Sequence, residues 1–215
     1  LLRRRRDLGR DGRALLRRRQ PLVQGIEYVP QSGPCIVVMN HYERSGLRVW
    51  WCALLVTAAL SNRRDGDLPM CWLITDRLEG FRMYGVRFPD RLMAWLLSRI
   101  ASVYGLLMVA RPEGEVGSRS LVLRKALQKL RGGMVLGITP EAANGDGTQL
   151  ARPWPGSSAA LGWLSGGEVP LVPVAVFDDA QGRLVSNFGE PFRLVRMGDE
   201  GASGIVMAAI AELLP

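Results

Sequence analysis

Four groups of polar residues follow apolar runs of the sequence, and their types suggest acid–base and anion-binding chemistry. His41, the single histidine, can act as a general base near neutral pH and stands with Asn40 directly after such a run. The other groups are Arg111, then Glu141 with Asn144 and Asp146 behind it, and finally Gly156, Ser157 and Ser158 at a predicted helix start. An arginine can bind an anionic group, and a helix N-terminus can receive an anion. Taken singly, each also has a structural explanation: a satisfied core histidine, an ion pair between Arg111 and Glu113, or a turn capped by Glu141.

Six short apolar runs, bounded by turn residues, predict the strands that must position these side chains. They cover residues 35–39, 70–75, 106–110, 134–139, 171–177 and 184–188, and they alternate with helical segments at about 47–60, 90–103, 118–131, 155–165 and 205–214. This alternation predicts an α/β fold, a single domain with a mostly parallel sheet flanked by helices on both faces. Ligands bind at the carboxyl ends of the strands in such sheets, so we expect the four polar groups to share one rim.

The positive charge is concentrated at the start of the chain. The 215 residues carry a formal net charge of +8, and residues 1–19 hold nine arginines against Asp7 and Asp11. We therefore expect a basic N-terminal arm over residues 1–21 and a nearly neutral domain over residues 22–215. Such an arm is typical of a tether to a polyanion, either an anionic membrane surface or nucleic acid. The alternative is a solvated helical extension.

The composition excludes several classes of protein. A hydrophobic share of 47% excludes intrinsic disorder. Three dispersed cysteines exclude a fully paired disulfide framework, so we expect a reducing, cytoplasmic setting. One histidine excludes a multi-histidine metal site, and we expect no metal. The longest uncharged apolar run, residues 49–60, is shorter than the roughly 20 residues that span a bilayer, and it predicts a buried or interfacial helix. No signal-peptide pattern follows the arginine cluster.

Four sequence blocks resemble the motifs of the glycerophospholipid, or lysophosphatidic acid-type, acyltransferase superfamily. Residues 37–41 (VVMNH) resemble its first motif, NHxxxxD, and residues 105–111 (GLLMVAR) resemble its second, a strand that ends in an acceptor-binding arginine. Residues 139–144 (TPEAAN) resemble the third motif, FPEGTRS, and residues 169–174 (VPLVPV) match the fourth, VPIVPV. The blocks occur in the family's order, and the resemblance covers roughly residues 22–195.

The resemblance implies an enzyme of phospholipid biosynthesis that moves an acyl group from acyl-CoA or acyl carrier protein to a hydroxyl of a lipid or glycolipid. It needs no further cofactor, and it works at the cytoplasmic membrane surface. His41 would be the general base on the acceptor hydroxyl, Arg111 would contact a phosphate or another polar group of the acceptor, and backbone amides near Gly156 would stabilise the oxyanion. The implied catalytic residues are His41, Glu43 and Glu141, and the implied substrate-binding residues are Asn40, Arg111, Pro140, Asn144, Gly156 and Ser157.

The chain departs from the family pattern at its most important carboxylate. The aspartate of the first motif, which hydrogen-bonds the second imidazole nitrogen, is replaced by Gly46, and the third motif has Ala142 in place of glycine and lacks its basic residue. Three alternatives remain for the role of this aspartate. Another carboxylate takes it over, either Glu43 or Glu141; a backbone carbonyl takes it over; or no group does. Gly46 therefore leaves open a catalytically silent lipid- or acyl-binding relative. A nucleic-acid-binding protein is disfavoured because the arginine arm lacks interleaved aromatic residues.

Overall fold

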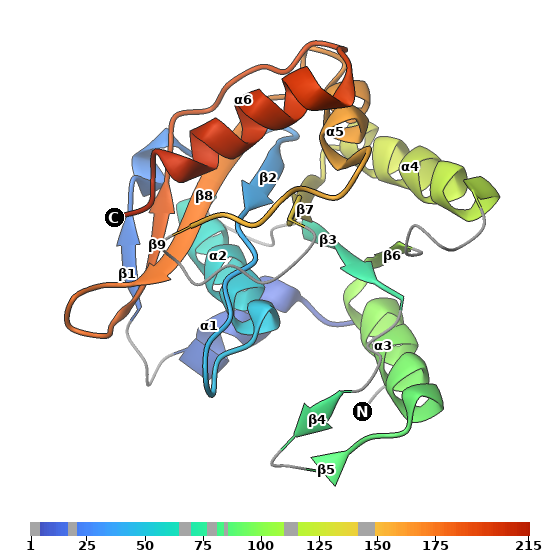
Figure 1. Cartoon of the computed structure of the whole chain (residues 1–215), viewed down its shortest axis with the longest axis vertical. Coiled ribbons are helices and arrows are strands. Elements are labelled where there is room, and N and C mark those ends of the chain that lie inside the picture. Colours follow the sequence, from blue (N-terminus) through green and yellow to red (C-terminus); the bar gives the residue numbers. More distant parts are fainter. Residues whose placement is uncertain are drawn as a thin grey trace.

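A mixed seven-stranded sheet forms the centre of the protein. The computed structural model describes residues 5–16, 21–64, 70–76, 81–83, 86–109, 116–141 and 149–215. The strand order is β1 (Leu22–Gln24), β9 (Leu184–Phe188), β8 (Leu171–Asp178), β2 (Ile36–Met39), β7 (Val135–Ile138), β3 (Met70–Thr75) and β6 (Leu107–Val109). The five strands from β8 to β6 are parallel, and β9 runs antiparallel to β8 (Figure 1). The predicted α/β class, with a mostly parallel sheet, is confirmed.

Helices cover both faces of this sheet because its central strands are apolar on both sides. The helices are α1 (Leu8–Leu16), α2 (Val49–Arg63), α3 (Asp90–Tyr104), α4 (Val116–Arg131), α5 (Ser157–Ser165) and α6 (Asp199–Ala211), with a 3₁₀ turn η1 (Ile26–Tyr28). Val37 and Met39 of β2 point into a core shared with α2, whereas Ile36 and Val38 point into a second core shared with α4, α5 and α6. The alternation along one strand thus builds two cores back to back.

Helix α2 is a buried helix and not an interfacial one. Cys52, Leu55, Val56 and Leu60 are almost completely inaccessible, and the apolar run that defined the helix faces protein on most of its sides. Of the two alternatives predicted for residues 49–60, a buried or an interfacial helix, this burial supports the buried one. Among its described side chains, Trp50 is the one large apolar group that is exposed.

Helix α1, from the basic arm, packs against α2. Leu16 lies in a small cluster with Leu55 and Ala58, and a β-carbon added at Gly12 would come within 3.0 Å of the Leu54 carbonyl oxygen. The close approach of the two helices therefore depends on a glycine in this interface. The arginines of the arm are thus connected to the domain through a packed helix. Within the described ranges, we find no helix that has both the length and the apolar character to cross a bilayer.

The hairpin before α3 was not predicted from the sequence. A short antiparallel hairpin, β4 (Arg82–Met83) with β5 (Val86–Arg87), follows β3 and leads into α3. The hairpin and the N-terminal half of α3 extend from the body of the protein, near the end where the connection between β2 and α2 lies (Figure 1). Strands of two residues have too few side chains for an alternating pattern to be visible in the sequence.

Candidate active site

His41 lies just beyond the carboxyl end of β2, where a buried carboxylate holds its backbone. The Glu141 carboxylate accepts a hydrogen bond from the His41 N–H through Oε2 and one from the Ala151 N–H, at 2.6 Å, through Oε1. Glu141 follows β7, the neighbour of β2, and only 2% of its surface is exposed. Burial raises the pKa of Glu141, while the two N–H donors act in the opposite direction. Glu141 therefore positions the backbone of the histidine.

Asn40 fixes the other side of the same strand end. Its Nδ2 donates to the Val176 carbonyl oxygen at 2.9 Å, and its Oδ1 accepts from the Val176 N–H at 2.7 Å. The side-chain amide therefore takes the place of a backbone partner for β8 beyond the point where β2 ends. Asn40 is almost fully buried, so both amide groups act within the protein. Contact between Asn40 and a substrate stays a prediction.

The imidazole of His41 is partly buried. Within the described ranges, Nδ1 is shielded from solvent and has no hydrogen-bond partner. Burial lowers the pKa of His41 below the usual histidine value, and the negative charge of Glu43 opposes this shift without reversing it. The ring is therefore neutral at neutral pH, which is the protonation state that a general base requires.

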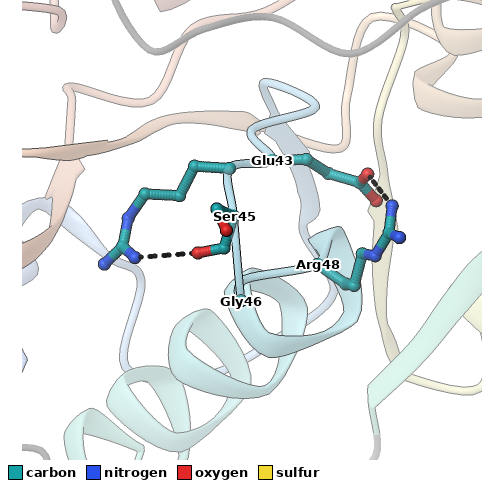
Figure 2. A pocket seen from close by; sticks show the side chains of 5 residues that line it. Glu43, Ser45, Gly46 and Arg48 are labelled. Carbon is teal, nitrogen blue, oxygen red and sulfur yellow. Dashed lines mark hydrogen bonds and ion pairs between the residues drawn. The ribbon is translucent and has the colours of Figure 1, made fainter. Parts of the chain in front are cut away.

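The carboxylate of Glu43 caps the following helix. Its Oε1 accepts a hydrogen bond from the backbone N–H of Val49, the first residue of α2, at 3.2 Å. Its Oε2 accepts one from the Arg48 guanidinium at 3.0 Å (Figure 2). A negative charge at a helix N-terminus is favourable, which explains this orientation. Glu43 thus acts on the imidazole through its charge, and Nδ1 of the ring donates no hydrogen bond to this carboxylate.

Gly46 occupies a tight turn between His41 and α2. Arg44 and Leu47 exchange two backbone hydrogen bonds of 3.2 and 2.9 Å, and Gly46 has a φ of +76° at the corner of this turn. A left-handed backbone favours glycine, so the turn gives this residue a structural reason. A β-carbon at position 46 would meet no atom within 4 Å, so space for a side chain exists. The turn lines a hollow of about 380 Å³ together with Glu43, Arg44, Ser45 and Arg48 (Figure 2).

A polar cluster fastens this turn to the end of β8. The Tyr42 hydroxyl donates to the Asp178 carboxylate at 2.9 Å, and the Arg44 guanidinium forms an ion pair with the same carboxylate. Burial and the hydrogen bond to Asp178 raise the pKa of Tyr42 to about 12, so its phenol stays protonated and cannot act as a base near neutral pH. Asp178 directly ends a predicted strand, so its position on the rim could have been recognised from the sequence.

The N-terminus of α5 is occupied by a carboxylate of the protein itself. Asp199 of α6 accepts hydrogen bonds from the Gly156 N–H at 2.7 Å and from the Ala159 N–H at 3.0 Å. Ser157 donates its hydroxyl to the Pro140 carbonyl oxygen at 3.3 Å. The anion expected at this helix start is thus Asp199 in this structure, a partner for which the sequence gives no signal. Roles of Gly156, Ser157 and Pro140 in substrate binding stay predictions.

The described residues bring together only part of the expected site. Five of the expected residues lie around the ends of β2 and β7: Asn40, His41, Glu43, Pro140 and Glu141. Arg111, Asn144 and Asp146 lie outside the described residues, so their predicted roles stay predictions.

The role of Glu141 can be tested by its amide variant. We expect Glu141→Gln to lower the free energy of unfolding by about 1–3 kcal/mol, because an amide NH₂ would face one of the two buried N–H donors. The free energy is measured by urea denaturation. Glu190→Gln, at an exposed position, serves as the matched control and should be neutral. Equal stability of the Glu141→Gln variant and the unaltered protein would refute the bridging role.

One of the comparisons with known proteins identifies the family. The family model described as Acyltransferase matches residues 20–177. A search of curated proteins finds no match. Among solved structures, the chain is similar to the 1-acyl-sn-glycerophosphate (LPA) acyltransferase PlsC of Thermotoga maritima, with a TM-score of 0.62 and 15% sequence identity. The alignment covers 95% of this chain and 76% of that one, and at this identity it shows a shared fold. The family match spans well over half of the sequence and includes His41 and Glu141, so the chain belongs to the Acyltransferase family.

Proposed function

We propose that the protein transfers an acyl group from acyl-CoA or acyl carrier protein to a hydroxyl of a lipid or glycolipid, with His41 as the general base. The observation that carries this proposal is the partly buried imidazole held at the carboxyl edge of the sheet, where burial lowers the pKa of His41. Glu141 and Asn40 fix the backbone on both sides of the catalytic position through four hydrogen bonds. The solved acyltransferase with the same fold acts on an acylated glycerol phosphate, which supports a lipid acceptor here.

The reaction needs one proton transfer in each direction. The His41 imidazole takes the proton of the acceptor hydroxyl, and the oxygen attacks the carbonyl carbon of the acyl thioester. A new C–O bond forms, the C–S bond breaks, and the imidazolium returns its proton to the leaving thiolate. The imidazole is regenerated, so no metal or redox cofactor enters the balance. Arg111 and Asn144 are proposed to contact the acceptor.

The positive charge that appears on the imidazole needs a counter-charge. In the family's first motif an aspartate supplies it, but Gly46 stands at that position here. Glu43 favours the protonated ring through its charge while its oxygens bind Val49 and Arg48. We propose that Glu43 supplies this counter-charge at a distance, which is a weaker device than a direct hydrogen bond.

The Gly156 amide can stabilise an oxyanion only if its N–H is released from its present hydrogen bond. The Gly156 N–H donates to Asp199, and a tetrahedral intermediate could use this N–H only after that carboxylate moves away. The second candidate function is lipid or acyl binding without catalysis. It is favoured by the Nδ1 atom of His41, which has no hydrogen-bond partner within the described ranges.

The His41→Ala variant separates these two candidates. We expect turnover of acyl-CoA with a lysophospholipid acceptor to fall by about 10²–10⁴-fold, because general-base catalysis contributes about that much. The fold should persist, since no described residue hydrogen-bonds to Nδ1. Turnover is measured from released thiol, and folding is measured by thermal unfolding. A folded variant with undiminished turnover would exclude His41 as the base. A wild-type protein that binds acyl-CoA without turning it over would establish the silent relative.

The charge of Glu43 makes a prediction about pH. Glu43→Gln removes the charge that favours the imidazolium, so the pKa of His41 should fall further and the acidic limb of kcat/KM should move to lower pH. Because Nδ1 of His41 has no hydrogen-bond partner among the described residues, the variant loses charge and no bond to that atom, so we expect turnover at neutral pH to fall by less than about tenfold.

The control for this experiment is Glu190→Gln, which should leave the limb in place. The reverse change is Gly46→Asp, which should move the acidic limb to higher pH, whereas Gly46→Asn reports the effect of a side chain at a left-handed position without its charge. A loss of several orders of magnitude in Glu43→Gln would instead show that Glu43 bonds the ring directly.

A further inference from the structure

The N-terminal half of α3 presents large apolar side chains to solvent. Leu92 is 46% exposed and Trp95 is 53% exposed, and Val86 of the neighbouring strand β5 is 63% exposed. Leu92 and Trp95 are three residues apart and therefore adjacent on the helix surface. Single exposed apolar residues are ordinary on protein surfaces. An adjacent tryptophan and leucine on a part of the protein that protrudes indicate an interaction site (Figure 1).

Positive charges border these apolar side chains. Arg91 and Arg99 lie four residues before and after Trp95 on the same exposed stripe, and the Arg99 guanidinium carbon is 5.9 Å from the centre of the Trp95 ring. Arg87 of β5 is also exposed and pairs with Asp90 at 3.9 Å. We call the set Arg87, Arg91, Leu92, Trp95 and Arg99 the α3 patch. It combines apolar groups with cations, and one of these cations, Arg87, pairs with an acidic residue, Asp90.

The basic arm joins the patch at the other end of the same helix. The backbone N–H of Arg6 donates to the carbonyl oxygen of Val103 at 3.0 Å, and the Tyr104 hydroxyl donates to Asp11 at 2.8 Å. The arginine-rich start of the chain is thus fastened to the last turn of α3. The arm and the patch, which are far apart in the sequence, thus lie at opposite ends of one helix.

Aromatic contacts connect the start of α2 to the segment just before α3. The Trp50 ring, at the start of α2, lies 6.1 Å from the Phe81 ring, which precedes the β4–β5 hairpin. Phe81 in turn contacts Phe88, just before α3, at 5.9 Å. A chain of aromatic contacts thus connects the His41 side of the sheet to the base of α3.

We propose that the α3 patch is the surface through which the protein docks on an anionic lipid bilayer. Tryptophan is suited to the polar–apolar boundary of a membrane, leucine is suited to the acyl region, and arginine is attracted to anionic headgroups. This charge complementarity favours a bilayer over a protein partner or a second copy of the chain. The proposal rests on the proposed function for its purpose, because docking there would bring lipid acceptors beside the His41 turn.

The test uses the full chain and vesicles, without any substrate. Co-sedimentation is measured with phosphatidylcholine vesicles that contain about one third phosphatidylglycerol, and with phosphatidylcholine vesicles alone. We expect binding to the anionic vesicles and a loss of at least about tenfold in partitioning for the double variant Leu92→Ser/Trp95→Ser. Val195→Ser/Ile205→Ser is the matched control, because these residues are similarly exposed. Val195 lies beside α5 and Ile205 lies on α6, and both helices are away from α3 (Figure 1).

Salt separates the contributions of charge and apolar contact. At about 0.5 M salt the attraction of the arginines is screened, and the remaining binding of the wild type should still exceed that of the Leu92→Ser/Trp95→Ser variant. Thermal unfolding is measured for both double variants to check that each is folded.

Two results would overturn the proposal. One is equal vesicle binding by the wild type and the Leu92→Ser/Trp95→Ser variant. The other is a wild type that binds no anionic vesicle but forms an oligomer that this variant loses, which would assign the patch to a second copy. Since no substrate is present, absence of acyl transfer in a separate assay counts against the proposed function and leaves the docking result unchanged.

Discussion

A buried carboxylate connects the segments on which the candidate site depends. Glu141 accepts one hydrogen bond from the His41 backbone and one from the Ala151 backbone, so a single side chain joins the end of β2, the end of β7 and the segment that leads to α5. Burying this group costs solvation, and the two N–H donors offset that cost. Asn40 adds a second clamp, to β8. The position of the imidazole is therefore determined by backbone anchoring on three neighbouring strands.

The anchoring fixes the backbone of His41 but gives its imidazole ring no hydrogen bond at Nδ1 from the described residues, and this determines the electrostatics of the ring. The backbone is fixed, but Nδ1 has no hydrogen-bond partner within the described ranges, and burial makes the neutral ring the stable form. A base of this kind is ready to accept a proton but holds the proton weakly, because the nearby Glu43 charge only partly replaces a bonded carboxylate. The glycine at position 46 and the turn it closes are thus directly connected to the chemistry expected of the site.

Much of this arrangement could be predicted from the sequence, and the remainder depends on long-range contacts. The apolar runs identified six of the sheet strands, and the motif order identified the family, because buried parallel strands and rim residues leave local patterns. The partners of the site residues left no such pattern. Val176 and Ala151 contribute backbone groups, and Asp199 reaches Gly156 from 43 residues away. The start of α6 was also predicted too late, because Gly201 and Gly204 weaken the helical signal in its first half.

The most direct test of this account is an NMR titration of the imidazole. Because the chain has one histidine, its ring resonances need no assignment among competitors, and their midpoint gives the pKa of His41. We expect a midpoint below the usual histidine value of about 6.5 in the folded protein, since desolvation outweighs the attraction of Glu43. The midpoint should return to about 6.5 in denaturant. A folded-state midpoint above that value would show that a carboxylate bonds the ring, and it would contradict the neutral, unpartnered base described above.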